Sequence, residues 1–509
     1  MKVSNLELPP NLKAEGVIEQ LGEKVALQLF SKQYLLKTFY DSFDWRLYRN
    51  NLICEFNRSR QTSIFTLTEK KSGEIAASSI LFDVPSFSKQ FNPGKVRQIL
   101  EPLLEMRALL TVSTLECEAY QIFVHNEDDK IVLRLLIEEF QLLNSRVTIY
   151  PVKGYDKIAA QVNELLIKKM DAKLSEKPVM LEALRLQGRR PKDYSSKLEI
   201  LLTPEMQADA ACKLIFSNLL RTIKVNEQGA IGDIDSEFLH DFRVAVRRTR
   251  TALGQVKTLL PEDLVSRYKV FFSWLGKITC ESRDLDVYLL NFDKYKKKLP
   301  PDIRQSLNPL NNFLLQKKQK SHKELAKKLR SSKYLTMLTE WEQYLSSNSP
   351  IVSAETIMPL SVKQFADNRI WKAYKQVIKQ GEVIDKDSRP EALHQLRKTC
   401  KKLRYLIEFF KPLYAEKPLE QLIKSLKRLQ DVLGEYQDLA VQQAQLKQFS
   451  EEMQTVNIPS KTFMAMGVLI QALENRKIVV REHFDDQFHV FRKRDNHELF
   501  HDLFATRKT

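Results

Sequence analysis

Two segments of this sequence carry rows of cations at a spacing suited to phosphate. In the first, the chemistry lies in His240, Arg243, Arg247 and Arg250, which stand at i, i+3, i+7 and i+10 and so share one stripe of a helix. In the second, the same positions hold His394, Arg397, Lys401 and Arg404. Arg248 and Lys402 widen the two rows. Guanidinium groups donate paired hydrogen bonds to phosphate oxygens, and ammonium groups add a mobile point charge. The rows therefore predict a polyanion site.

The two rows belong to an internal repeat. A shift of 154 residues takes His240-Asp241-Phe242-Arg243 to His394-Gln395-Leu396-Arg397, and it also takes Asp284 to Asp438 without a gap. We expect two copies of one helical unit, near 205–345 and 355–485, related by pseudo-two-fold symmetry. Facing rows would then form a basic cleft or channel.

An apolar stripe runs beside each row and is expected to pack inward. Its members are Leu239, Phe242, Val246, Thr249 and Leu253 in the first copy and Leu393, Leu396, Cys400, Leu403 and Ile407 in the second. Like charges three or four residues apart destabilise a helix by tenths of a kcal/mol, roughly 0.2–0.5 for each pair, unless a polyanion neutralises them. A single such row is more often a solvated face, but its duplication favours binding.

The roles of the repeated histidines and aspartates stay open. His240 and His394 either contact phosphate or orient a nearby acid such as Asp284 or Asp438. The ordinary structural role of those aspartates is to cap helices or to position the arginines, and we prefer that role to a catalytic one.

The pattern of residue types changes from strand-like to helix-like near residue 150, and this change predicts an α+β fold. Before that point, runs rich in β-branched and aromatic residues predict a mostly antiparallel sheet, with strands over 52–56, 63–69, 110–116, 120–125 and 130–140, a hairpin turn at 126–129 and a helix near 95–105. After it, three- and four-residue spacing predicts helices over 156–173, 205–224, 236–257, 263–280, 283–297, 302–330, 333–346, 360–380, 390–411, 418–434, 437–453 and 460–482. We expect domains over 1–175 and 196–509, with a polar linker over 176–195.

Charge points to an acidic partner for the second domain. The chain carries a formal net charge of +17, yet residues 1–190 hold 27 basic and 24 acidic residues, so most of the excess lies beyond them. We see no signal peptide and no transmembrane segment. Five scattered cysteines without a C-x-x-C pair are typical of a reducing cytoplasm, and neither a zinc site nor another cofactor is expected.

The cation rows resemble the conserved-histidine α-helical domain, or CHAD, family over roughly 196–509. The first copy carries the family pattern in full: His240, Arg243, Val244, Arg247, Arg248, Arg250, then Arg283-Asp284-Leu285-Asp286-Val287. The second copy has diverged, with Gln437 where the first has Arg283. The resemblance implies two four-helix bundles, a basic pore or groove, and binding of inorganic polyphosphate without catalysis. It also implies a cytoplasmic protein, with polyphosphate granules as one location.

The N-terminal half more weakly resembles the CYTH, or triphosphate tunnel, domain. The resemblance rests on Phe39-Tyr40-Asp41-Ser42, Lys130-Ile131-Val132-Leu133-Arg134-Leu135 and Val152-Lys153-Gly154-Tyr155. That family needs Glu-x-Glu-x-Lys on its first strand, and the nearest match here is Asn5-Leu6-Glu7-Leu8-Pro9. Glu138 and Glu139 are adjacent, so on a strand they point to opposite faces and cannot share one metal ion. We therefore expect a degenerate domain and no enzyme activity.

Three functions compete. Polyphosphate binding is preferred; hydrolysis of triphosphate or polyphosphate in the N-terminal domain and binding of nucleic acid are the alternatives. The cation rows lack the interleaved aromatic residues typical of single-stranded nucleic-acid binders. Other basic residues offered as site members are Lys213, Arg221, Arg283, His322, Lys424 and Arg428. The basic tail from Arg492 to Lys508 is expected to be disordered or to close over the ligand.

Overall fold

The computed structural model describes residues 3–175, 177–256, 259–347, 360–454 and 457–505. The chain divides into two compact units, residues 1–195 and 196–509, which are described separately. None of the described helices is both long enough and apolar enough to cross a lipid bilayer.

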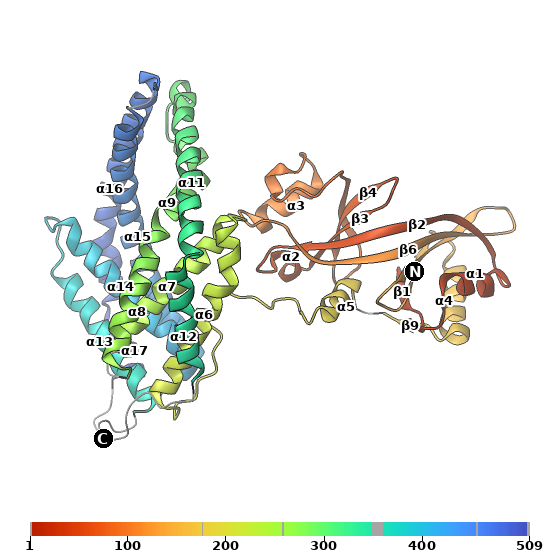
Figure 1. Cartoon of the computed structure of the whole chain (residues 1–509), viewed down its shortest axis with the longest axis horizontal. Coiled ribbons are helices and arrows are strands. Elements are labelled where there is room, and N and C mark those ends of the chain that lie inside the picture. The colour runs from red at the N-terminus through yellow and green to blue at the C-terminus, as the bar shows by residue number, and fades with distance from the viewer. Residues whose placement is uncertain (1–2, 176, 257–258, 348–359, 455–456, 506–509) are drawn as a thin grey trace. The chain divides into compact units, whose positions relative to one another are not determined.

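The N-terminal unit is built on a nine-stranded sheet in the order β5-β4-β3-β2-β6-β7-β8-β1-β9, and its neighbouring strands pair antiparallel. The strands are β1 (Ser4–Glu7), β2 (Ala26–Asp41), β3 (Leu52–Arg58), β4 (Ser63–Glu69), β5 (Ile75–Ile80), β6 (Leu110–His125), β7 (Ile131–Phe140), β8 (Arg146–Pro151) and β9 (Lys173–Leu174). The long strands β2 and β6 lie side by side at its centre (Figure 1). The predicted antiparallel sheet is confirmed.

Two expected strands are in fact one. Residues 110–116 and 120–125 both belong to β6, because the residues between them keep pairing with β2 and β7. The predicted turn at 126–129 is confirmed: Asp129 takes a positive φ of 58°, and the Asn126 side chain accepts hydrogen bonds from the backbone of Asp128 and Lys130.

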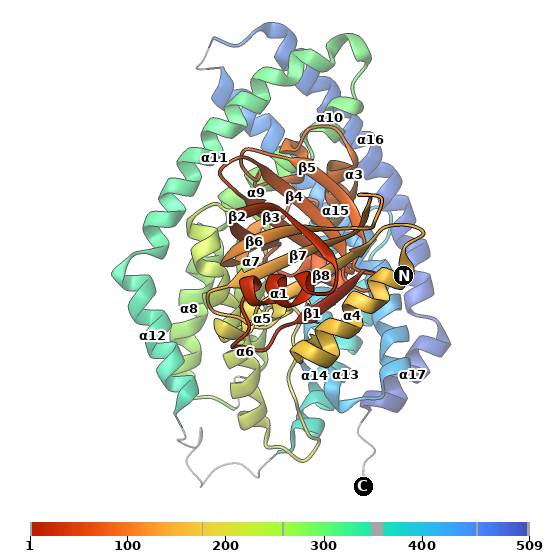
Figure 2. The ribbon, with the colours of Figure 1, turned by 90° about the vertical axis from the view of Figure 1, so that its right-hand side faces the viewer.

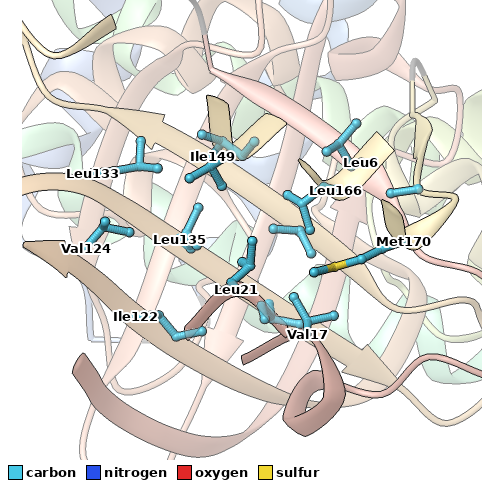
Figure 3. Packing of buried hydrophobic residues seen from close by; sticks show 14 of the residues in the cluster. Leu6, Val17, Leu21, Ile122, Val124, Leu133, Leu135, Ile149, Leu166 and Met170 are labelled. Atoms are coloured by element: carbon cyan, nitrogen blue, oxygen red, sulfur yellow. The ribbon is translucent and has the colours of Figure 1, made fainter. Parts of the chain in front are cut away.

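One face of the sheet is apolar and covered by helices. At one end, α1 (Ala14–Gly22) and α4 (Asp156–Met170) pack on it, and Figure 3 shows the side chains of Val17, Leu21, Leu166 and Met170 against those of the strands. At the other end, α3 (Lys95–Leu104) contributes to a second cluster. The unit also contains α2 (Arg46–Arg49), the 3₁₀ turn η1 (Ser88–Gln90) and α5 (Val179–Leu186). Part of the segment expected to be linker is therefore helical.

The C-terminal unit is all helical. Its elements are α6 (Ala208–Ile231), α7 (Ser236–Gln255), α8 (Glu262–Ile278), α9 (Cys280–Leu290), α10 (Phe292–Lys297), η2 (Pro301–Leu307), α11 (Asn308–Leu329), α12 (Ser332–Ser346), α13 (Val362–Glu382), α14 (Pro390–Phe410), η3 (Lys411–Leu413), α15 (Glu416–Met453), α16 (Ser460–Phe491) and α17 (Arg494–Phe504). The predicted all-α half is confirmed.

The helix boundaries follow the repeat. Helices α6, α7 and α8 begin at residues 208, 236 and 262, and α13, α14 and α15 begin 154 residues later, at 362, 390 and 416. Within this unit, α11 and α12 run along one side and their counterparts α16 and α17 along the other (Figure 2). The first copy thus comprises α6 to α12, and the second comprises α13 to α17.

Two expectations about the second copy are wrong. The helices expected over 418–434 and 437–453 form the single 38-residue helix α15. Part of the tail expected to be disordered or to close over the ligand forms α17, whose Phe500 stacks on Tyr374 of α13 with ring centroids 3.9 Å apart. Residues 506–509 of that tail lie outside the described residues.

Candidate functional site

The cation rows sit on helices that are fixed in rotation by their apolar stripes. The predicted stripes of α7 and α14 are buried in full, from Leu239 to Leu253 and from Leu393 to Ile407. The start of α7 is set by Asp235, whose carboxylate accepts hydrogen bonds from the backbone of Glu237 and Phe238. Because the stripes face the core, the neighbouring rows of cations are held at its margin.

Helices α7 and α14 contact each other, so the charges of the two rows act on one another. Burial, and then the charges of Arg397 and Arg247, lower the pKa of Lys401 to about 8. Burial likewise lowers the pKa of Arg397, with Arg247 adding to that shift and Asp438 opposing it. The charge of Arg247 in the first copy therefore acts on Arg397 and Lys401 in the second.

Two carboxylates already lie in this site. Glu408 accepts a hydrogen bond from Arg248 Nη2 at 2.8 Å and from Arg404 Nε at 2.8 Å, so it joins the first copy to the second. Asp438 accepts from Arg397 Nη2 at 3.2 Å. Glu408 was not predicted as a partner of the cation rows, although it stands four residues after Arg404 and so lies on the same side of the helix.

Arg243 is turned toward the protein. Its Nη1 donates to the carbonyl oxygen of Gly276 at 3.1 Å and to Oγ1 of Thr279 at 2.7 Å. These groups lie where α8 ends and α9 begins, so this guanidinium holds the helix break. Asp284 accepts hydrogen bonds from the Cys280 thiol and from the Gln445 side-chain amide. Burial raises the pKa of the Asp284 carboxyl group.

The second repeated histidine contacts an amide. His394 Nδ1 donates to Oε1 of Gln437 at 2.6 Å, so this histidine contacts the neighbour of Asp438. His240 is half-buried at the matching position of α7.

Several predicted site residues serve other contacts. Arg283 donates to the carbonyl oxygen of Ser236, and Lys213 donates to that of Ser347. His322 lies 3.1 Å from the carbonyl oxygen of Ala230. Three more are exposed on helices (Arg221, Lys424 and Arg428), as is Arg250 in the first row. Lys402 is half-buried, and burial, then Arg369 and Lys372, lower its pKa.

The N-terminal sheet has a polar face that the sequence analysis largely missed. Lys37 Nζ lies 2.5 Å from Glu138 and 3.8 Å from Glu55, and Lys37 is 6% exposed. Glu138 and Glu139 point to opposite faces, as predicted: Glu139 instead pairs with Lys13. Lys37 stands two residues from both Leu35 and Phe39, so the three side chains lie on the same face of β2. A lysine between two large apolar residues on one face was the available sign that it is buried.

Helix α5 packs on the same polar face. Its Met180, Ala183 and Leu184 join a buried cluster with Phe39 and Leu115. Arg146 of β8 donates to the carbonyl oxygen of Lys177 and pairs with Glu182 of α5 at 2.9 Å. Among the described residues, no group of three or more His, Cys, Asp or Glu side chains is placed to hold a metal ion.

Part of the helical unit is similar to a known protein family. Residues 214–447 match the CHAD domain family model. Two uncharacterized proteins of Mycobacterium tuberculosis (strains CDC 1551 and H37Rv) are 29% identical over 143 residues, which are 28% of this chain and 26% of each relative. The match thus spans about a quarter of the curated relatives.

Similar solved structures fall into two groups. The CHAD domain of Ricinus communis is 24% identical (57% of this chain, 95% of that chain, TM-score 0.49), and PptA of Streptomyces chartreusis is 14% identical (56% and 100%, TM-score 0.41). A putative adenylyl cyclase of Hippeastrum, described as having a dominant triphosphatase activity, is 10% identical (38% and 100%, TM-score 0.30).

Proposed function

We propose, from the premise that residues 214–447 form a CHAD domain, that this protein binds inorganic polyphosphate between α7 and α14 without cleaving it. The observation that carries the proposal is the contact of α7 with α14, where Arg248 of the first copy donates to Glu408 of the second at 2.8 Å and the cation rows of both copies flank that contact. Cations held together at the margin of a core repel one another, and a chain of phosphates relieves that repulsion.

The geometry narrows the set of binding residues. The groove, defined here as Arg247, Arg397, Lys401 and Arg404, draws cations from both copies. Arg243 and Arg283 hold backbone carbonyls, so they are assigned to positioning the helices. The carboxylates of Glu408 and Asp438 occupy the positions where phosphate oxygens would bind, and a bound chain competes with them.

The test is calorimetric titration of the full chain with long-chain polyphosphate. The groove variant carries Arg247→Gln, Arg397→Gln and Lys401→Gln. A matched control carries Lys294→Gln, Lys447→Gln and Lys461→Gln, which remove the same charge from exposed positions on other helices. We expect salt-sensitive binding by the wild type and the control and a loss of about 100-fold or more in the groove variant.

Equal binding by the groove variant and the control, with both folded by circular dichroism, would reject the groove as the site. Absence of binding by the wild type would reject the function. Competition with duplex DNA and single-stranded RNA separates polyphosphate from nucleic acid, since a polyphosphate site prefers the inorganic chain at equal phosphate concentration.

A hydrolase in the N-terminal unit is the second candidate. The observation in its favour is the buried Lys37 with Glu55 and Glu138 on one face of the sheet. Against it, these groups neutralise one another, and α5 packs on the same face. We infer that this unit is not catalytic. Mg²⁺-dependent release of phosphate from tripolyphosphate, lost in a Glu138→Gln variant, would establish the enzyme instead.

A further inference from the structure

The outward face of α11 carries a second row of cations. Lys320, Lys323, Lys327 and Arg330 are exposed and stand at i, i+3, i+7 and i+10, the spacing of the groove rows. We call these four residues the α11 row. The buried side of the helix, which includes Leu314, Leu325 and Leu329, faces the opposite way. Figure 2 shows α11 along one side of the helical unit.

The cations of the α11 row are not paired within the protein. Nearby lysines that turn inward are paired: Lys317 with Glu452 and Lys318 with Asp286. Within the described part of the chain, none of the four cations of the α11 row forms an ion pair. One carboxylate, the exposed Glu324, stands beside the row between Lys323 and Lys327 and offsets one of its four charges in part, and the neighbouring Gln316 and Gln319 are neutral.

Folding alone does not account for this row. Cations in the last turn of a helix are favoured by the helix dipole, which covers Lys327 and Arg330 but not Lys320 and Lys323. The second copy shows that the unit folds without the row. A shift of 155 residues takes the buried Leu314, Leu325 and Leu329 of α11 to the buried Leu469, Val480 and Phe484 of α16. In that register, the positions of the α11 row hold Asn475, Ile478, Glu482 and Asp485.

We propose that the α11 row binds a second stretch of the polyphosphate chain held in the groove, and that it makes the protein prefer long chains. The inference rests on the proposed function. A chain that reaches both sites binds the second one intramolecularly, so its affinity gains from a high effective concentration. A short oligophosphate fills the groove alone and gains nothing from the α11 row.

The chemistry of this face selects a bare polyanion. It presents no aromatic side chain on which a nucleobase could stack. It presents no apolar side chain to insert into a membrane surface. Three of its four cations are lysines, which act as point charges and suit a flexible chain of phosphates.

The experiment measures the affinities of tripolyphosphate and long-chain polyphosphate for four full-length proteins. These are the wild type, the groove variant, an α11 variant and a charge control. The α11 variant carries Lys320→Gln, Lys323→Gln, Lys327→Gln and Arg330→Gln, in which glutamine keeps helix propensity. The charge control carries Lys294→Gln, Lys298→Gln, Lys447→Gln and Lys461→Gln, which are exposed and do not form a row.

We expect the α11 variant to lose about tenfold in affinity for the long chain relative to the charge control, and to bind tripolyphosphate within about twofold of it. Equal long-chain affinity in the two variants overturns the inference while leaving the groove intact. Failure of the wild type to bind either ligand removes the proposed function, and the inference with it. Binding of duplex DNA that is lost in the α11 variant, with long-chain polyphosphate unaffected, assigns the row to nucleic acid and overturns the inference.

Discussion

The Arg248 guanidinium, from the first copy of the helical repeat, lies 2.8 Å from the Glu408 carboxylate of the second. The same carboxylate accepts a hydrogen bond from Arg404, so one acid pairs with a cation of each copy. An internal anion of this kind stabilises the unliganded helices and competes with a bound phosphate. Stability and affinity at this position are therefore opposed.

Replacing Glu408 by glutamine separates the two effects. We expect the Glu408→Gln variant to bind polyphosphate several-fold more tightly, because Arg248 and Arg404 are released, and to lose about 1–3 kcal/mol of unfolding free energy. Calorimetry and urea unfolding measure the two quantities. The control is Glu416→Gln, which removes an exposed acid paired with Lys411. A drop in affinity would show instead that Glu408 positions the arginines for the ligand.

If the proposed site binds polyphosphate, we expect its affinity to depend on pH through Lys401. Its pKa in the unliganded protein is about 8, lowered by burial and then by Arg397 and Arg247, and bound phosphates raise it. Below that pH Lys401 is charged in both states and affinity is complete. As the pH rises above about 8, the unliganded protein loses this proton first, so affinity falls. Affinity measured across this range tests the sign, and Lys401→Arg, which stays charged, flattens the curve. An unchanged slope in that variant would assign the titration to another group.

Lys401 also destabilises the unliganded fold. Its folded pKa lies below the ordinary value of 10.5, so the charged form is disfavoured in the native state at neutral pH. We expect Lys401→Gln to raise the thermal midpoint by about 2–4 °C while it weakens polyphosphate binding. Calorimetric scanning with and without ligand measures both. A lower midpoint without ligand contradicts the repulsion described for the groove.

Packing around α13 is tested by a pair of glycine substitutions. A methyl group on Gly381 would meet the ring of Phe488 at 2.0 Å, whereas one on Gly467 of α16 meets nothing within 4 Å. We expect Gly381→Ala to cost about 1–3 kcal/mol and Gly467→Ala to gain about 0.5–1 kcal/mol. Urea unfolding of the two variants checks the contrast, which equal values would contradict.

The buried pair of the N-terminal sheet gives a further test. The side chains of Lys37 and Glu138 are 7% and 8% exposed. Lys37→Met leaves an uncompensated buried carboxylate, so we expect a loss of about 3–5 kcal/mol. The double variant Lys37→Met with Glu138→Leu should recover most of that loss. If the double variant is no more stable than the single one, the pair is not the source of the cost.

The periodic features of this chain were predictable, and its long-range partners were not. Apolar stripes and cation rows follow from helical spacing, and the 154-residue repeat fixed where the second set lies. The contact of Arg248 with Glu408 spans 160 residues, and that of Lys37 with Glu138 joins strands distant in sequence. No local pattern pairs such residues. The two cation rows and Asp438, as a partner of an arginine, were therefore predictable, whereas the contact of Glu408 with the other copy was not.

Misplaced element boundaries have physical causes. Helix α15 continues through Gly434, where a break was expected, because one glycine inside a helix costs only about 1 kcal/mol relative to alanine. Burial of Leu429, Leu433 and Leu439 on either side keeps the helix intact. Burial by tertiary contacts similarly joined the two runs of β6 and made α17 a packed helix.

The helix break between α8 and α9 shows how duplication has let equivalent residues divide their labour. Arg243 is occupied by the backbone at that break, whereas its counterpart Arg397 lies beside an unbroken helix and contacts the exposed Asp438. At this one position the first copy therefore uses its arginine to hold its own backbone, whereas the second copy leaves the equivalent arginine on a solvent-exposed carboxylate. A substitution in the second copy can therefore change this position without disturbing the helix break of the first copy. In a symmetric dimer of single copies, every substitution would appear in both subunits, so the two equivalent positions could not change separately.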